Sequence, residues 1–266
     1  IQFMIRIINY FFQSIIIYLF FLIGRLLGIK ISRKVFSLLF YLIGPIFKSK
    51  KIINKNLEIF NKNISFKEKQ KIINDMWKNY GKTFIEYIYL NNFKNNNTHI
   101  ILSGEENLLE FTQRKKPVIF VSGHFANFEL MSMEITKKNI PLATIYRPLN
   151  NFFLNPLMEF IRKKYVCRNQ IKKGLHGVRE AINFIKKKHC IAMMIDQRVS
   201  EGENVDLFNV PALTTTLPAQ LSSKFNLNII PVFIKRDKND NFKIEFKKPI
   251  NPENFKNKLE LTKELN

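Results

Sequence analysis

Long apolar stretches dominate the first fifth of the chain, and the pattern changes to shorter alternating segments further on. Residues 3–23 are mostly aliphatic and aromatic, and residues 35–47 form a second apolar stretch with cationic side chains before and after it. About 20 apolar residues are needed to cross the hydrocarbon core of a bilayer, and cations favour its charged surface. Residues 1–47 are therefore predicted to form a membrane anchor with interfacial helices, the alternative being a hydrophobic helical hairpin packed on a soluble core. The positive-inside rule places the basic side and residues 48–266 in the cytoplasm.

Helical spacing of apolar residues follows over residues 51–89, and an Asn-rich polar segment at 91–98 is typical of a loop and a boundary. Beyond residue 100, short apolar runs alternate with amphipathic segments. Strands are predicted over residues 117–121, 142–146, 190–195, 229–235 and 242–246. Helices are predicted after the first strand to about residue 137, then over 151–165 and 175–188, and in a short segment ending at 225 after a long loop. This order predicts an α/β domain over residues 48–266, with a mostly parallel mixed sheet flanked by helices.

An imidazole and a carboxylate follow the first strand of this predicted sheet. The strand runs into Gly123 and His124, and Glu129 comes five residues after the histidine. A histidine beside a carboxylate is a common way to build a general base near pH 7. Five residues of regular helix would put the two side chains on different faces, so we expect His124 in the turn before the helix and Glu129 in its first turns.

Polar residues also follow the next two strands, and side chains at the carboxyl ends of neighbouring strands cluster in such sheets. Tyr146 and Arg147 follow the second strand, and Asp196 and Gln197 follow the third. Arg147 is suited to clamp a phosphate or a developing oxyanion, or to form an ordinary surface ion pair. Asp196 can hold Arg147, cap the following turn or contact substrate.

Charge and cysteine usage limit the partners. The chain has 43 Lys and Arg against 21 Asp and Glu, a formal net charge of +22, which favours anionic lipid, an acidic protein or nucleic acid. The basic residues are scattered without a recognisable nucleic-acid-binding module, so nucleic acid is not expected. Basic runs such as 162–164, 172–173 and 186–188 are typical of solvated helix faces, or of surfaces that dock an acidic carrier protein or anionic headgroups.

Cys167 and Cys190 are read as free thiols, with no disulfide framework or metal site.

Several segments together resemble one family. Residues 123–129 resemble the His-x4-Asp/Glu motif of the late acyltransferases of lipid A biosynthesis, the lauroyl/myristoyl acyltransferase family. Further similar segments, in the same order, are residues 77–83, 146–148, 195–197 and 208–214. The chain departs from the family pattern at Ala126 and Asn209, where Gly is usual, at Phe128, where Trp is usual, and in lacking a Trp-rich C-terminal tail. We therefore expect the natural protein to continue past Asn266.

The resemblance implies a glycerolphosphate-acyltransferase-like fold and transfer of a fatty acyl chain from acyl carrier protein to a hydroxyl of a lipid A precursor. His124 would be the general base, oriented by Glu129, and substrate would contact Asn127, Tyr146, Arg147, Asp196 and Gln197. It implies no metal, no cofactor other than the acyl carrier protein co-substrate, and a bacterial inner-membrane location with the catalytic domain facing the cytoplasm. Two alternatives stay open: a related acyltransferase acting on another glycolipid or phospholipid, and a non-catalytic protein that binds anionic lipid.

Overall fold

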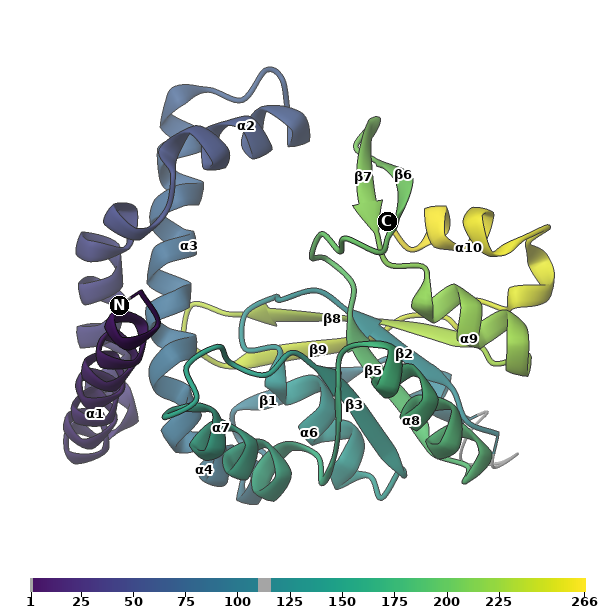
Figure 1. Ribbon diagram of the computed structural model, residues 1–266, viewed down its shortest axis with the longest axis horizontal. Helices are drawn as coiled ribbons and strands as arrows, with labels where there is room; N and C mark the ends of the chain where they lie inside the picture. The colour runs from purple at the N-terminus through teal and green to yellow at the C-terminus, as the bar shows by residue number, and fades with distance from the viewer. Residues whose placement is uncertain (1, 110–115) are drawn as a thin grey trace. The chain divides into compact units, whose positions relative to one another are not determined.

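The structure is a computed structural model that describes residues 2–109 and 116–266 (Figure 1). Its internal contacts divide the chain into two compact units. The first comprises the chain up to Asn91 together with Asn151–Leu154, and the second comprises Asn92–Asn150 and Asn155–Asn266. The division predicted at residue 47, between an anchor and the α/β domain, stays a prediction.

The first unit is built from helices packed through aromatic side chains. Its helices are α1 (Gln2–Phe47), α2 (Lys50–Phe60), α3 (Phe66–Glu86) and a 3₁₀ turn (Tyr87–Tyr89). Gly28 interrupts α1 with φ 74° and ψ 158°, a conformation that glycine adopts without strain. The segments before and after this kink both contact Phe84 of α3, through Phe21 and Phe36 respectively. The predicted single helical region over residues 51–89 is thus two helices, the second started by a capping box at Ser65.

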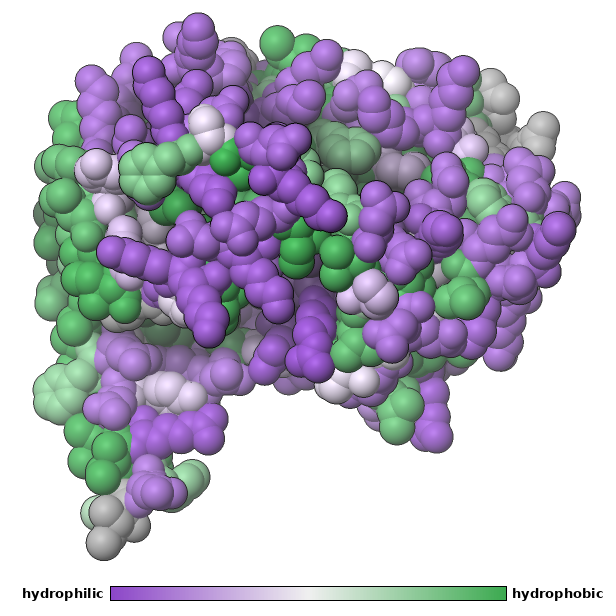
Figure 2. All heavy atoms as spheres, turned by 90° about the horizontal axis from the view of Figure 1, so that it is seen from above, coloured by the Kyte–Doolittle hydropathy of each residue, from purple (hydrophilic) through white to green (hydrophobic). Residues whose placement is uncertain are grey.

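Helix α1 presents much of its apolar surface outward. Its segment Gln2–Ile46 is long and apolar enough to cross a membrane, judged by length and composition. Figure 2 shows hydrophobic residues gathered along α1, whereas hydrophilic residues predominate elsewhere on the face drawn. Leu26 and Ile46 are each 79% exposed, so this surface is not covered by α3.

The second unit contains a seven-stranded mixed sheet with the strand order β1-β9-β8-β2-β5-β3-β4. The strands are β1 (Ile100–Ser103), β2 (Ile119–Ser122), β3 (Leu142–Tyr146), β4 (Asn169–Lys172), β5 (Cys190–Met194), β8 (Ile229–Arg236) and β9 (Phe242–Phe246). Neighbouring strands run parallel except β8 and β9, which pair antiparallel. The predicted fold class, an α/β fold with a mostly parallel mixed sheet, is confirmed.

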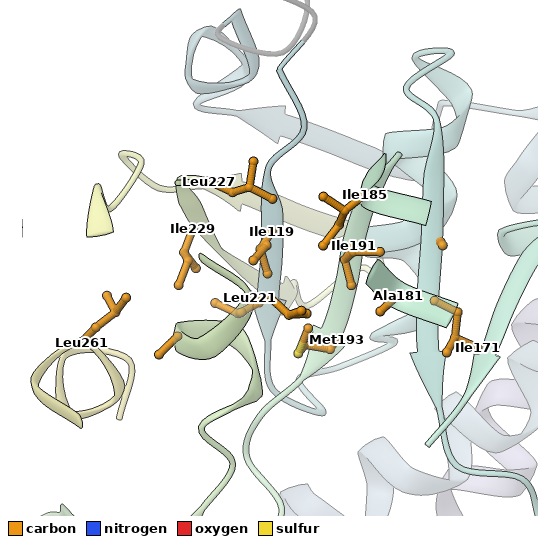
Figure 3. Packing of buried hydrophobic residues seen from close by; sticks show 13 residues of the cluster. Ile119, Ile171, Ala181, Ile185, Ile191, Met193, Leu221, Leu227, Ile229 and Leu261 are labelled. Atoms are coloured by element: carbon orange, nitrogen blue, oxygen red, sulfur yellow. The ribbon is translucent and has the colours of Figure 1, made fainter. Parts of the chain in front are cut away.

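Helices cover both faces of this sheet. They are α4 (Leu90–Asn95), α6 (Glu129–Lys137), α7 (Asn155–Ile161), α8 (Leu175–Lys186), α9 (Leu217–Phe225) and α10 (Lys258–Glu264). Figure 3 shows Ile119, Ile191 and Met193 of the central strands packed against side chains of α8 and α9. Successive strand residues face opposite sides, so Thr144 lies on the other face, where its hydroxyl donates to Ser132 of α6.

Several local features differ from the sequence-based expectations. The segment 91–98, predicted to be a loop, is helical up to Asn95, where α4 ends. The long loop predicted before residue 215 contains a hairpin of β6 (Glu203–Leu207) and β7 (Val210–Thr214), joined by Phe208 and Asn209 at φ 52° and 60°. Positive φ at both turn residues is the geometry of a tight hairpin turn. Strands β1 and β4 and helix α10 have no counterpart among the predicted elements. The predicted helix over residues 151–165 begins only at Asn155, and after Ile161 it continues as a π-helix, Arg162–Val166.

Candidate active site

His124 and Asp196 meet where the two central strands end. Backbone pairing of β2 and β5 continues past the strands, with the amide of Ile195 donating to the carbonyl of Ser122 at 2.9 Å. The backbone N–H of His124 donates to Asp196 Oδ2 at 2.8 Å, and His124 Nδ1 lies 2.7 Å from Asp196 Oδ1. One carboxylate therefore holds both the main chain and the ring of His124.

This contact determines which ring nitrogen is basic. Burial raises the pKa of Asp196, but hydrogen bonds from the ring and backbone of His124 outweigh burial and hold the pKa below its ordinary value. An ionised carboxylate only accepts hydrogen bonds, so the neutral ring must carry its proton on Nδ1 and leave a lone pair on Nε2. That Nε2 lies 3.5 Å from the side-chain nitrogen of Gln197. The rings of His124 and Phe128 pack in a T-shaped arrangement, with centroids 4.6 Å apart.

Glu129 binds an arginine instead of the ring. It is the first residue of α6, and its carboxylate Oε1 accepts from Arg162 Nε at 2.8 Å and lies 2.7 Å from Nη2. Both side chains are largely buried, at 7% and 12% exposure. The sequence predicts Glu129 as the carboxylate that orients the ring of His124, whereas in the structure Asp196 is hydrogen-bonded to that ring. Arg162 was missed because its basic run resembled a solvated helix face.

A second polar cluster stiffens the neighbouring wall. The Tyr146 hydroxyl donates to Glu159 at 2.6 Å, and Lys172 Nζ lies 3.5 Å from the same carboxylate oxygen. Burial, together with the hydrogen bond to Glu159, raises the pKa of Tyr146, so the phenol stays protonated at neutral pH. The guanidinium of Arg162 lies over the Tyr146 ring, 5.6 Å from its centroid. This contact links the Tyr146 cluster to the Glu129–Arg162 pair.

The ring of His124 opens onto a cavity of about 400 Å³, enough for part of a large amphipathic substrate. Its apolar lining comes from Phe128, Ile145, Pro148, Leu149, Met193, Met194, Val199 and Leu217. Its polar lining includes Glu129, Ser132, Thr144, Tyr146, Arg147, Arg162, Gln170, Lys173 and Gln197. Apolar and cationic surfaces in one cavity suit a substrate that combines hydrocarbon with negative charge.

Most of the predicted site residues reach this cavity. His124, Glu129, Tyr146, Arg147 and Gln197 line it. Two others support it: Asp196 holds the ring of His124, and the buried Asn127 lies in the turn between His124 and Glu129.

The backbone of that turn accounts for the glycine that is usual in the family at position 126. Ala126 has φ 44°, in the left-handed region where glycine is unstrained, which is a physical reason for the glycine usual in the family.

The cysteines lie apart from this chemistry. Both are buried; burial raises the pKa of Cys190 to about 12 and also raises that of Cys167. Neither lines the cavity around His124. Within the described residues, no group of three or more His, Cys, Asp or Glu side chains is arranged to hold a metal ion.

Comparison with known proteins supports the resemblance. A search of curated proteins found no match to the chain. The family model for bacterial lipid A biosynthesis acyltransferases matches residues 2–266, nearly the whole chain, including the strands that carry His124 and Asp196. The chain therefore belongs to the bacterial lipid A biosynthesis acyltransferase family, and its activity is acyl transfer in lipid A biosynthesis.

Proposed function

We propose that the protein transfers a fatty acyl chain from an acyl carrier protein thioester to a hydroxyl of a lipid A precursor, at the bacterial inner membrane. The single observation that carries the mechanism is the pairing of His124 Nδ1 with Asp196 at 2.7 Å, beside a cavity with apolar and cationic walls. This pairing makes Nε2 of His124 the base that an acceptor hydroxyl needs.

This geometry supports the following mechanism. A hydroxyl whose pKa is far above 7 attacks a thioester effectively only if a base takes its proton as the new bond forms. His124 Nε2 takes that proton while the hydroxyl oxygen bonds to the thioester carbon. The C–S bond then breaks, and the leaving thiolate takes the proton from the imidazolium. Asp196 stabilises the imidazolium between these steps, as the carboxylate does in a Ser-His-Asp triad.

Glu129 and Arg162 act on the cavity wall. Their buried ion pair fixes the guanidinium against the Tyr146 ring, so Glu129 contributes to substrate position through Arg162. The developing oxyanion needs hydrogen-bond donors, which backbone N–H groups near the start of α6 can supply. The thioester supplies the driving force, so the chemistry requires no metal or other cofactor.

The net charge and the exposed apolar surface support the proposed acyl donor and the proposed membrane attachment. A net charge of +22 favours an acidic carrier protein and an anionic glycolipid. The exposed apolar surface of α1, followed by cations at Lys48, Lys50 and Lys51, fits a helix inserted in the bilayer with the catalytic unit on the cytoplasmic side.

The test is acyl transfer by membranes containing the protein, supplied with a mixture of acyl carrier protein thioesters and a tetra-acylated lipid A precursor. Mass spectrometry should show one added acyl chain with the wild type and none with His124→Ala. Transfer only to a phospholipid or another glycolipid would show that the proposed acceptor is wrong, while the proposed mechanism would stand. Full transfer by a folded His124→Ala variant would overturn the mechanism. No transfer to any acceptor would favour a protein that only binds anionic lipid.

A further inference from the structure

Two cations of the cavity lack a carboxylate partner among the residues that the structure describes. Arg147, Arg162 and Lys173 line the cavity, and Glu129 is the one carboxylate among the described lining residues. That carboxylate is bound by Arg162. Throughout the described ranges, no hydrogen bond or ion pair involves the side chain of Arg147 or Lys173, and both residues are exposed. Among the described residues, the cavity lining therefore holds two cations, Arg147 and Lys173, that no carboxylate pairs.

Backbone pairing places these two cations side by side. Arg147 directly follows β3 and Lys173 directly follows β4, and the last residues of these parallel strands, Tyr146 and Lys172, are register partners. The backbone N–H of Lys173 donates to the carbonyl of Tyr146 at 2.8 Å, which extends the pairing by one residue. Neighbouring strands lie about 5 Å apart, so both side chains start from adjacent positions at the same edge of the sheet.

The chain then turns sharply, which keeps Lys173 at this edge. Gly174 has φ 131°, a backbone conformation that residues other than glycine rarely adopt, and α8 begins at the next residue. Lys172, on the other side of Lys173, is bound to Glu159 outside the cavity lining. The two consecutive lysines therefore differ in environment: Lys172 has a carboxylate partner, whereas Lys173 has none within the described part of the chain.

We propose that Arg147 and Lys173 form a phosphate-binding pair that holds a phosphate monoester of the acceptor glycolipid in the cavity. The inference rests on the proposed function, in which an acyl chain passes to a glycolipid hydroxyl. A guanidinium binds two phosphate oxygens in one plane, and an ammonium adds a third charged contact. A phosphate monoester carries a charge of about −1.5 to −2 at pH 7, which matches two cations better than the single charge of the phosphodiester on a carrier protein's prosthetic arm.

Steady-state kinetics with two acceptors tests this. Wild type, Lys173→Gln, Arg147→Gln and the double variant are compared on a phosphorylated lipid A precursor and on the same precursor after phosphatase treatment. Lys173→Gln should raise the KM for the phosphorylated acceptor at least about tenfold and change kcat less than about threefold. On the dephosphorylated acceptor, wild type and Lys173→Gln should have equal kcat/KM. Because both residues hold one group, the double variant should lose less affinity than the product of the single losses predicts.

The matched control is Lys187→Gln, which removes the same charge from an exposed lysine just past the far end of α8. It should behave as wild type on both acceptors, and all variants should keep the wild-type melting temperature. Equal losses on both acceptors, or equal losses in Lys187→Gln, would overturn the proposal. A rise confined to the KM of the acyl donor would assign the pair to the donor's phosphate instead.

A binding measurement separates this inference from the proposed transfer reaction. Detergent-solubilised protein is titrated with vesicles of neutral phospholipid that contain either the phosphorylated or the dephosphorylated precursor. Preference of wild type for the phosphorylated vesicles, lost in Lys173→Gln and kept in Lys187→Gln, supports the phosphate site even if no acyl transfer is found. Equal binding of both vesicle types by wild type would overturn it whether or not transfer occurs.

Discussion

Replacing Asp196 with asparagine should disable the base while leaving the cavity intact. The carboxylate makes two contacts with His124, at 2.8 Å to the backbone N–H and 2.7 Å to Nδ1. Asparagine has one oxygen and one NH₂ group. If its oxygen keeps the backbone contact, its NH₂ group faces Nδ1 and donates to it, which forces the ring proton onto Nε2. Nε2 then has no lone pair with which to accept the proton of the acceptor hydroxyl.

The expected loss in kcat is large. General-base catalysis contributes roughly 10²- to 10⁴-fold, and an asparagine that imposes the wrong tautomer in a Ser-His-Asp triad costs about 10⁴-fold. The dyad is about a third exposed, at 31% and 38% for the two side chains, so some rings will rotate and recover a basic nitrogen. We therefore expect Asp196→Asn to lower kcat about 10²- to 10⁴-fold and to change the KM for either substrate less than about threefold, because Asp196 does not line the cavity.

The assay is steady-state acyl transfer by purified protein in detergent micelles, with Glu129→Gln measured beside it. Glu129→Gln should raise the acceptor KM as well as lower kcat, because it frees Arg162 at the cavity wall. Asp196→Asn with more than a tenth of the wild-type kcat, beside a Glu129→Gln variant with none, would refute the reasoning. Glu129 would then be the carboxylate that serves His124 during catalysis.

Further predictions concern stability and reactivity. Glu129→Gln should lower the free energy of unfolding by about 3 kcal/mol, because Arg162 loses its buried carboxylate, and Glu129→Gln with Arg162→Met should recover part of that loss in thermal melts. Gly81→Val should cost roughly 3 kcal/mol, because a Cβ atom there would lie 2.1 Å from a backbone carbonyl oxygen of α1; Gly81→Ala should be the milder variant. Cys190 should be alkylated at pH 8 at least about a thousandfold more slowly in the folded protein than in denaturant, as measured by mass spectrometry. The pKa of Asp196 is lower in the folded protein than in the unfolded chain. The stabilising contribution of its carboxylate should therefore be full above about pH 4 and should be lost as the pH falls through the folded-state pKa. The difference in melting temperature between wild type and Asp196→Asn should shrink over that pH range.

The sequence revealed those parts of the fold that have strong local patterns. Strand β5 is almost wholly apolar because it is covered on both faces, and it was predicted within one residue of its ends. Strand β4 (Asn169–Lys172) lies at the sheet edge with a single fully buried residue, so its mostly polar sequence gave no strand signal. The β6/β7 hairpin was not predicted because Pro211 lies within its second strand, and proline in a sequence argues against a strand.

The sequence predicted which residues lie together at the ends of the strands, but not how their side chains pair. His124, Arg147 and Gln197 were correctly expected near one another because carboxyl ends of parallel strands share one edge of the sheet. The partner of His124 was not predicted, because Asp196 lies 72 positions further along the chain and β2 and β5 are adjacent only in space. A carboxylate five residues away was the more obvious candidate from the sequence.

Glu129 and Asp196, the two carboxylates of the site, have different counter-charges and different exposure. Glu129 is the more buried, at 7% side-chain exposure, and it is paired with a guanidinium that is charged at every accessible pH. Asp196 is 38% exposed and is paired with the imidazole. A deeply buried carboxylate whose sole counter-charge was a histidine would lose that counter-charge whenever the ring became neutral. The carboxylate would then be an unpaired buried charge, which is strongly destabilising. Arg162 therefore stabilises the buried charge of Glu129, and the carboxylate paired with the ring is the more exposed Asp196, which stays the hydrogen-bond acceptor that keeps the ring proton on Nδ1.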